Sequence, residues 1–203
     1  VEGARFPFGG LGVDAEILND YNTLKHGVGA SPVFKPVLQN LGGYFAAFFG
    51  KTMPRRMRNM LGGVRTEVRV VNLGDEAYAL HGGKPVKTFG RGDVMYEGPS
   101  TTTMFGTLPY YGHGMTVLPY SMTRPGFFHL RTAEMSVMKA LTNLPSIWKG
   151  SYVGEDMHDW HCKHVRLEFS DAVPYQYGGD AQGWRDSIEV KISPLSVNLL
   201  RFI

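Results

Sequence analysis

Apolar and polar residues alternate along much of the chain with the period of two that is typical of strands. In "TEVRVVNLGDEAYAL" (66–80), Val68 and Val70 alternate with charged residues, and Gly74-Asp75 predicts the turn of a hairpin. Further strands are predicted around 86–90, 100–107 and 115–118, and after the turn in "RPGFFHLRTA" (124–133). Four closing strands are predicted in "HCKHVRLEFS" (161–170), "YQY" (175–177), "DSIEVKIS" (186–193) and "LSVNLLRF" (195–202).

The segment "FPFGGLGVDAEILND" (6–20) predicts a strand, a glycine turn and a second strand. After the glycines, Val13, Ala15 and Ile17 alternate with Asp14 and Glu16. This alternation places Asp14 on the opposite face from its apolar neighbours. Asp14 is then either an exposed strand residue or a polar group that lines a cavity.

Two segments show the spacing of helices instead. Between residues 31 and 49 the apolar residues recur every three or four positions, and Gly42-Gly43 weakens this helix. "AEMSVMKALTNL" (133–144) predicts a short amphipathic helix. With 26 glycines and 12 prolines spread along the chain, the pattern predicts a mainly-β domain over residues 1–203. We expect a β-sandwich with one or two helical insertions.

The cysteine count, the apolar runs and the first residues of the chain indicate its cellular compartment. Cys162 is the single cysteine, which excludes an internal disulfide framework and favours a reducing, cytoplasmic compartment. No apolar run approaches the roughly 20 residues of a membrane span, and the first residues do not resemble a signal peptide. Because the sequence starts without methionine, we expect a domain of a longer protein.

Positive charge is concentrated between Lys51 and Arg65. This basic block consists of Lys51, Arg55, Arg56, Arg58 and Arg65, with no acidic residue among them. It suits an anionic lipid surface, a phosphate or a nucleic acid, or it is the solvated face of a helix. A nucleic-acid site would interleave aromatic side chains for base stacking, and none lies between Lys51 and Arg65.

The sequence "HDWHCKH" (158–164) brings four possible zinc ligands close together: His158, His161, Cys162 and His164. In a strand His161 and Cys162 point to opposite faces, and Cys162 shares its face with His164, Arg166 and Glu168. A strand with ordinary polar residues explains this pattern better than a metal site, and no metal ligand is assigned.

Two glycine-containing turns are candidates for presenting functional groups. Gly112 and Gly114 flank His113, and such glycines let backbone amides approach a phosphate, although a simple tight turn explains them as well. In "PYQYGGDAQGWRDS" (174–187), Gly178-Gly179 permits positive φ and predicts a hairpin turn. A carboxylate that follows such a turn, here Asp180, can act as a general base if a substrate hydroxyl comes within reach.

Several of these segments occur together, in the same order, in one family. The segments are "GLGVDAEI" (10–17), "YYGHGMTVLPYS" (110–121), "RPGFFHLR" (124–131), "YQYGGDAQG" (175–183) and "IEVKISPLSVNLLRF" (188–202). In them the chain resembles the C-terminal domain of the diacylglycerol kinase catalytic family, which includes sphingosine and ceramide kinases. Those enzymes have a nucleotide-binding domain with a G-G-D-G-T motif, followed by a β-sandwich that holds the lipid. No G-G-D-G-T occurs in these 203 residues, so the resemblance is to the second domain alone.

The resemblance implies roles for the candidate residues. The family's Q-V-D-G-E-P motif aligns with "QYGGDA" from Gln176, so that Asp180 replaces the glutamate base and Gly178 replaces a supporting aspartate. Asp14 matches an aspartate that binds the polar head of the lipid in the sphingosine kinases. Gly112, Gly114, Gly178 and Gly179 would then line turns close to the transferred phosphate.

Cofactors and partners follow from the same resemblance. ATP and Mg²⁺ would be bound mainly by an N-terminal nucleotide-binding domain, and the lipid would lie in the sandwich interior. Arg124 and Pro125 occupy positions where bacterial members carry acidic ligands of a structural magnesium, so this metal site is predicted to be lost. The basic block would rest on an anionic membrane as a peripheral contact.

The sequence therefore predicts the substrate-binding half of an ATP-dependent lipid kinase that phosphorylates diacylglycerol, a sphingoid base or a related lipid. Without the nucleotide-binding domain, this chain alone is expected to be inactive. The alternative is a non-catalytic lipid-binding or regulatory domain, consistent with glycine at 178 and with Arg124 and Pro125. A nucleic-acid-binding barrel is a third possibility that depends on the basic block alone.

Overall fold

The computed structural model describes residues 1–27, 50, 54, 65–111 and 114–195 of the 203-residue chain. In this part the strands are β1 (Phe8–Gly12), β2 (Glu67–Asn72), β3 (Glu76–His81), β4 (Lys84–Gly90), β5 (Val94–Pro99), β6 (Thr102–Gly106), β7 (Phe128–Ala133), β8 (Met157–Cys162), β9 (His164–Tyr177) and β10 (Asp180–Lys191). The helices are α1 (Val13–Gly27), α5 (Val137–Thr142) and α6 (Leu144–Trp148). The prediction of a mainly-β domain with helical insertions is confirmed.

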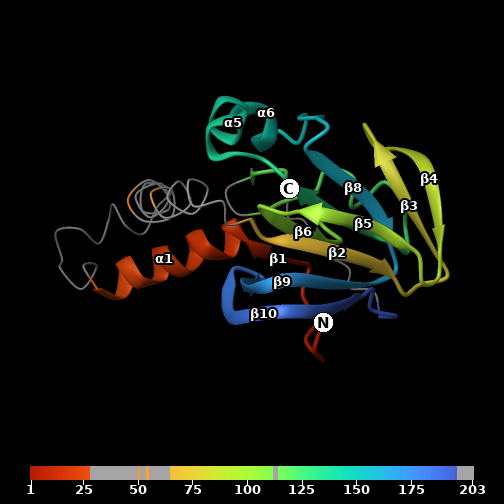
Figure 1. The fold of residues 1–203 in the computed structure, drawn as a ribbon, viewed down its shortest axis with the longest axis horizontal. Coiled ribbons are helices and arrows are strands. Elements are labelled where there is room, and N and C mark those ends of the chain that lie inside the picture. The colour runs from red at the N-terminus through yellow and green to blue at the C-terminus, as the bar shows by residue number, and fades with distance from the viewer. Residues whose placement is uncertain (28–49, 51–53, 55–64, 112–113, 196–203) are drawn as a thin grey trace, which may run out of the picture.

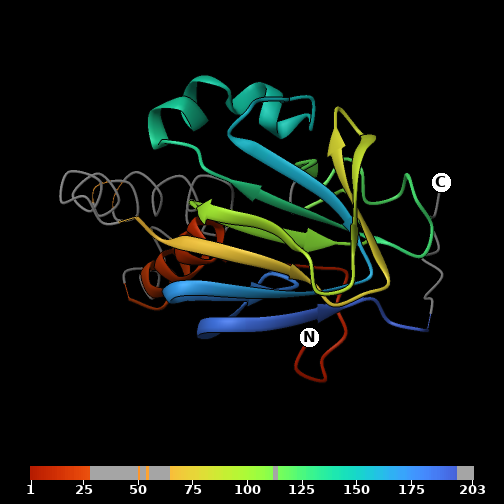
Figure 2. The same ribbon diagram turned by 45° about the vertical axis from the view of Figure 1, so that its right-hand side comes forward.

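All of these strands belong to one antiparallel sheet that folds over on itself. The order of neighbours is β4-β3-β8-β7-β6-β1-β9-β2-β5, and β10 pairs with β9. Figures 1 and 2 show β5, β2, β9 and β10 side by side, in front of the layer that contains β6, β7 and β8. The two layers face each other as in a sandwich, and α5 and α6 lie at a different edge of the sheet from α1 (Figure 1).

The long strand β9 joins the two layers. Its first half pairs with β2, with Leu167 opposite Val70, and its last residues pair with β1, with Gln176 opposite Gly10. The other edge of β9 pairs with β10, and the register between these two strands shifts twice. One strand therefore serves both layers, and β1 is held between β6 and β9.

The interior between the layers is apolar and contains a residue from every strand. The most enclosed side chains include Leu11, Val70, Phe105, Leu130, Trp160, Val165, Leu167 and Tyr175. The Tyr96 ring of β5 contacts the Trp160 ring of β8 edge-on, with 5.9 Å between centroids. Burial of this apolar surface is the main stabilising contribution to the fold.

Several details of the predicted strands are wrong. The strands around Val68 and Ala77 exist, but β2 pairs with β5 and β9 while β3 pairs with β4 and β8, so they do not form a hairpin with each other. Residues 115–118 form no strand. The run after His161 is not one strand either, because β8 ends at Cys162 and β9 begins at His164, so Cys162 lies in the core while His164 pairs with Glu189 at the surface.

The strand predicted after Gly12 is a helix. Gly12 has φ +93°, and a Cβ atom there would lie 2.5 Å from the Thr101 carbonyl oxygen, so glycine ends β1 at this point. The helix α1 then begins at Val13, whose N–H donates to the same carbonyl oxygen. Asp14 and Glu16 lie in its first turn, where acidic side chains are favoured by the helix dipole.

The helix predicted over 133–144 is confirmed as α5, and Ser136 caps it by accepting a hydrogen bond from the Lys139 N–H. The helix predicted between 31 and 49 lies outside the described residues, as does nearly all of the last predicted strand. No helix in the described ranges is long and apolar enough to span a membrane.

A buried asparagine fixes the end of β2. The Asn72 side chain donates hydrogen bonds to the carbonyl oxygens of Gly74, Phe89 and Gly90 at 2.8–3.3 Å, and accepts one from the Gly74 N–H at 3.0 Å. Asn72 is fully enclosed. One amide group thus satisfies backbone groups of two chain reversals, and most of these hydrogen bonds are buried.

Replacing this amide should destabilise the whole fold. We expect Asn72→Ala to lower the free energy of unfolding by about 2–3 kcal/mol, because buried backbone groups lose their partners. Urea unfolding at neutral pH measures this value. Asn143→Ala, which removes a half-buried asparagine whose side-chain hydrogen bond at the end of α5 is exposed, is the control and should cost less than about 1 kcal/mol. Equal losses in the two variants would contradict the structural role of Asn72.

Candidate functional site

The carboxyl group of Asp14 lies at the centre of a polar network. Its Oδ2 atom accepts hydrogen bonds from Gln176 Nε2 at 3.0 Å and from the Tyr111 hydroxyl at 3.3 Å, and its Oδ1 atom accepts one from the Thr102 hydroxyl at 3.2 Å. The Ala15 N–H donates to it as well. These partners come from four separate segments of the chain, so the fold itself assembles the site.

Glycine in β1 makes room for this carboxyl group. A Cβ atom at Gly10 would lie 2.2 Å from Asp14 Oδ2 and 2.9 Å from the Tyr111 hydroxyl, which is closer than any side chain could come. Gly10 therefore allows the Asp14 carboxyl group to rest directly on the backbone of β1. The Tyr111 hydroxyl also lies 3.1 Å from the Gly9 carbonyl oxygen, so its single proton is shared between Gly9 and Asp14.

Burial of its carboxyl group raises the pKa of Asp14, although the hydrogen bonds from Gln176, Ala15, Thr102 and Tyr111 act in the opposite direction. Raising the pKa means that this group holds a proton at higher pH than an ordinary aspartate. A carboxyl group that keeps its proton can donate a hydrogen bond to a ligand hydroxyl or amine, and it can also accept one from such a group.

Gln176 connects Asp14 to the β9–β10 hairpin. Its side chain is almost fully buried; while Nε2 donates to Asp14, Oε1 accepts from the Gly179 N–H at 3.1 Å. The Gly178 N–H donates to the Phe8 carbonyl oxygen at 3.0 Å. The turn predicted at Gly178-Gly179 is present, with φ +59° and +90°, as in the type I′ turns of two-residue hairpins.

Asp180 follows this turn as the first residue of β10, opposite Tyr177. The residue is exposed, and no described side chain hydrogen bonds to its carboxylate. The structure thus brings Asp14, Gln176 and the Gly178-Gly179 turn together, with Asp180 next to them on the outer side of the hairpin.

The other predicted site residues are placed less completely. Gly114 has φ +74° and is exposed, three residues after Tyr111 in the same loop. Gly112 and His113 lie outside the described residues. The basic block residues Lys51, Arg55, Arg56 and Arg58 also lie outside them.

The segment predicted to have lost a magnesium site is occupied by positive charge. The Arg124 guanidinium lies 3.8 Å from the centre of the Tyr78 ring and 4.6 Å from that of Phe127, and Lys163 Nζ lies 4.6 Å from the Phe127 ring. These are cation–π contacts, and such side chains do not fit a cation. Across the described ranges, no cluster of three or more histidine, cysteine or acidic side chains could hold a metal ion.

The four residues considered as zinc ligands have separate environments. The His158 ring lies beside Tyr96, His161 Nε2 lies 2.8 Å from the Tyr120 carbonyl oxygen, and His164 pairs with Glu189. Cys162 is fully buried in the apolar core, and burial raises the pKa of its thiol well above the ordinary value. The cysteine is therefore an unreactive core residue.

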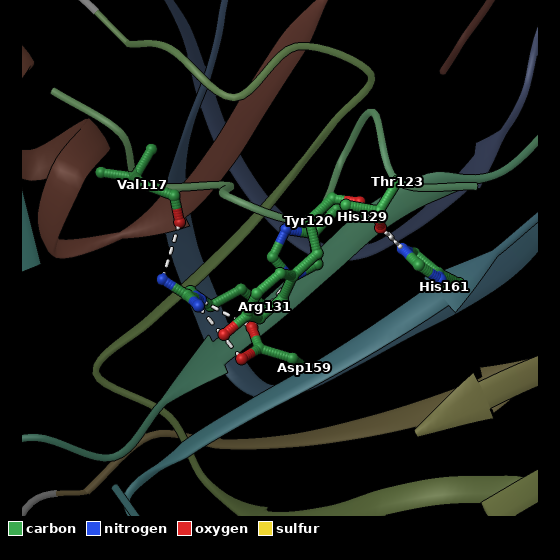
Figure 3. A network of polar contacts seen from close by, with 7 residues as sticks. All are labelled: Val117, Tyr120, Thr123, His129, Arg131, Asp159 and His161. Carbon is green, nitrogen blue, oxygen red and sulfur yellow. Dashed lines mark hydrogen bonds and ion pairs between the residues drawn. The ribbon is translucent and has the colours of Figure 1, made fainter. Parts of the chain in front are cut away.

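A second buried polar network lies under the loop that follows β6 (Figure 3). Arg131 is almost fully enclosed, and its Nε and Nη2 atoms donate to the two Asp159 carboxylate oxygens at 2.6 and 3.0 Å. His129 Nε2 lies 2.8 Å from Asp159 Oδ1. The third Arg131 hydrogen bond goes from Nη1 to the Val117 carbonyl oxygen at 2.9 Å.

Asp159 stays negatively charged and His129 favours its neutral form over most of the pH range. Burial tends to raise the pKa of Asp159, but the His129 hydrogen bond and the Arg131 charge outweigh it and hold this pKa at about 2. Burial lowers the pKa of His129, which favours the neutral imidazole. Arg131 and Asp159 thus form a buried ion pair that is flanked by a neutral histidine.

Several site residues carry little signal in the sequence. The sequence shows the glycines of "FGGLG", but not that Gly10 faces Asp14. Tyr111 and Gln176 lie 97 and 162 residues from Asp14 along the chain. No local pattern connects residues so far apart, and Gln176 is identified in sequence only by its motif.

The comparison with solved structures finds chains whose descriptions name diacylglycerol kinases. Three structures described as diacylglycerol kinases from Bacillus anthracis str. Sterne share 12%, 12% and 13% sequence identity with it, with TM-scores of 0.46, 0.48 and 0.47. Each match covers 92% of this chain, which spans about half of those proteins, 46–50% of their length. At such identities the likeness is one of fold. No protein-family model and no curated protein sequence matches the chain.

Filling the space at Gly10 should displace the Asp14 carboxyl group. We expect Gly10→Ala to destabilise the fold by about 1–3 kcal/mol and to move the pKa of Asp14, because the new Cβ atom and Oδ2 cannot share one position. Carbon-13 NMR of the aspartate carboxyl groups and urea unfolding measure the two effects. Gly90→Ala is the control, because a Cβ atom there has only an ordinary contact at 3.7 Å. An unchanged Asp14 titration in Gly10→Ala would contradict the close contact.

Acidification should weaken the fold in two stages. The pKa of His129 is lowered from 6.5, so the unfolded chain takes up a proton below about pH 6.5 that the folded chain does not. The pKa of Asp159 is about 2 instead of 3.8, so about 2 kcal/mol of stability present above pH 4 is lost as the pH falls towards 2.

Urea unfolding at about pH 7.5, 5.5, 3.5 and 2 measures this dependence. His129→Gln should reduce the loss between the first two values, whereas His81→Gln, which removes an exposed histidine outside the network, should leave it unchanged. Equal stability of the wild-type chain at pH 7.5 and 5.5 would be inconsistent with a buried neutral His129.

Proposed function

We propose that this chain is the lipid-binding half of an ATP-dependent lipid kinase. The observation that carries the proposal is the Gln176 side chain, which hydrogen bonds both to Asp14 and to the turn before Asp180. The motifs around these residues are those that resemble the diacylglycerol kinase catalytic family. The resemblance implies that Asp14 binds the lipid head and that Asp180 acts as the base. In this chain the buried amide of Gln176 hydrogen bonds to Asp14 and to the turn before Asp180.

In the proposed reaction, Asp14 binds a hydroxyl or amine of the lipid head. Its buried carboxyl group can accept a hydrogen bond from that group without first losing a full hydration shell, which favours a fixed orientation. The hydrocarbon chains of the lipid would contact apolar surface of the sandwich. Diacylglycerol and sphingoid bases both offer such a head group.

Asp180 would take the proton from the reacting lipid hydroxyl. The hydroxyl oxygen then forms a bond to the γ-phosphorus of ATP, the bond from this phosphorus to the β–γ bridging oxygen breaks, and ADP leaves. Because Asp180 is exposed, a nucleotide-binding domain that closes over the hairpin would exclude water from this step. That domain would also hold ATP and Mg²⁺, and the metal would neutralise phosphate charge.

A lipid-binding or regulatory domain without transfer activity is the second candidate. Two observations favour it: no described side chain supports the Asp180 carboxylate, and residue 178 is glycine instead of the supporting acid of the motif. Gly178 has φ +59°, a conformation that aspartate tolerates, and nothing lies within 4 Å of a Cβ atom there. The missing acid can therefore be restored without a steric conflict.

Phosphorylation assays of the full-length protein that contains this chain distinguish the two candidates. We expect Asp180→Asn to lower kcat about a hundredfold or more with little change in lipid affinity, because it removes the base but not the head-group site. Asp14→Asn should mainly raise KM for the lipid, and Gly178→Asp should raise kcat.

The matched control is Asp186→Asn, which removes an exposed aspartate farther along β10 and should leave both constants unchanged. Full turnover in Asp180→Asn would refute the assignment of the base. Lipid binding that requires Asp14, without phosphorylation in the wild-type protein, would establish the lipid-binding module instead.

A further inference from the structure

The Arg131–Asp159 pair contacts the loop that contains one of the partners of Asp14. Arg131 Nη1 donates to the Val117 carbonyl oxygen at 2.9 Å, from β7 to the loop between β6 and β7 (Figure 3). Both side chains of the pair belong to the sheet, since Arg131 lies opposite Asp159 in the β7–β8 register. The loop is therefore held by a rigid element.

Backbone hydrogen bonds within the loop connect the segment around Val117 to the segment that contains Tyr111. The Leu118 N–H, next to Val117, donates to the Pro109 carbonyl oxygen at 3.2 Å, and the Tyr111 N–H donates to the Met115 carbonyl oxygen at 2.9 Å. Leu118 is fully buried and packs with Met104 and Val117. The two arms of the loop, 109–111 and 115–118, thus keep a fixed relation to each other.

Tyr111 then reaches the candidate site. Its ring packs against Phe8, with 4.4 Å between centroids, and its hydroxyl hydrogen bonds to Asp14 and to the Gly9 carbonyl oxygen. Gln176 Nε2 donates to the same hydroxyl at 3.2 Å. This hydroxyl is therefore one of the four groups that hydrogen bond to the Asp14 carboxyl group, and its position affects the pKa of Asp14.

The next part of the loop is attached to the sheet by a histidine. His161 Nε2 lies 2.8 Å from the Tyr120 carbonyl oxygen and 3.2 Å from the Thr123 hydroxyl, and the Tyr120 ring lies 5.2 Å from the His129 ring (Figure 3). Two separate attachments, at Val117 and at Tyr120, leave the loop little freedom to slide along the sheet.

Stability alone is a weak reason to bury this ion pair. Removing Arg131 and Asp159 from water costs free energy that their attraction only roughly repays, and apolar side chains of similar size often stabilise a core as well. An apolar pair, however, could not hydrogen bond to the Val117 carbonyl oxygen. The buried charge thus supplies a directed contact to the loop that close packing would not.

We propose that Arg131 is a positioning residue for the carboxyl site at Asp14, and that it acts through Val117 and Tyr111. The proposal depends on the proposed function only for the nature of the ligand, a lipid hydroxyl or amine. The positioning itself can be measured in the 203-residue chain without any lipid.

Carbon-13 NMR titration of the Asp14 carboxyl group tests the connection in a double-mutant cycle. Tyr111→Phe removes a hydrogen bond that lowers the pKa of Asp14, so this pKa should rise. Arg131→Lys keeps the charge but cannot reach both Asp159 and Val117, so the pKa should rise in the same direction. In the double variant it should rise no further than in Tyr111→Phe alone, because both changes remove the same contact.

Arg166→Lys is the matched control, because Arg166 pairs with Glu189 on the surface and lies outside both networks. It should leave the Asp14 titration unchanged. Additive changes in the cycle, or no change in Arg131→Lys, would overturn the proposal, since a purely structural role of Arg131 predicts one of these results.

A measurement on the wild-type chain covers the case in which Arg131→Lys does not fold. The Arg131 guanidinium protons should exchange slowly with solvent and show nuclear Overhauser contacts to Val117. Rapid exchange, as in a free arginine, would overturn the proposal.

The affinity for a short-chain diacylglycerol or sphingoid base extends the test to function. We expect Arg131→Lys to weaken binding about tenfold in the wild-type background and hardly at all in Tyr111→Phe. Failure of the wild-type chain to bind either lipid would count against the proposed function, while the Asp14 titration would still decide the role of Arg131.

Discussion

The strand β9 has two edges and three partners, and this constraint determines where the candidate site can form. Because β2 takes the first half of one edge, the short strand β1 can pair only with the last residues of β9. That pairing sets Gln176 opposite Gly10 and within reach of Asp14. The same residues continue into the β9–β10 hairpin, so the pairing of β1 with β9 also brings the polar site together. A register shift between β1 and β9 would expose the core face and separate Gln176 from Asp14 together.

Within this frame, the site combines a close backbone approach with long-range hydrogen bonding. Gly10 removes the side chain that would exclude the Asp14 carboxyl group, and Tyr111 and Gln176 supply donors from distant segments. Each contribution is small, but a buried carboxyl group is costly unless its hydrogen bonds are satisfied. The polar network is therefore a costly way to stabilise a fold. This cost is a reason to connect the network with binding rather than with stability.

The parts of the structure that could be predicted from sequence are those in which local chemistry dominates. The hairpin at Gly178-Gly179 depends on two adjacent residues that accept positive φ, and the mainly-β class follows from repeated alternation. The strand predicted around Asp14 failed because Val13, Ala15 and Ile17 fit a period of two, while the close contact of Gly12 with Thr101 starts a helix. The hairpin predicted between β2 and β3 failed because distant strands compete for both. Hydrogen bonds such as that between Gln176 and Asp14 leave no local trace in the sequence.

The direct passage from β1 into α1 has a mechanical consequence. No loop separates Gly12 from Val13, so the fifteen-residue helix, roughly 22 Å long at 1.5 Å per residue, is joined rigidly to a strand inside the sheet. Asp14 lies one residue from this joint. The hydrogen bond from the Val13 N–H to the Thr101 carbonyl oxygen fixes the start of the helix. The position of the Asp14 carboxyl group is therefore set by the backbone of the sheet and not by a connecting loop.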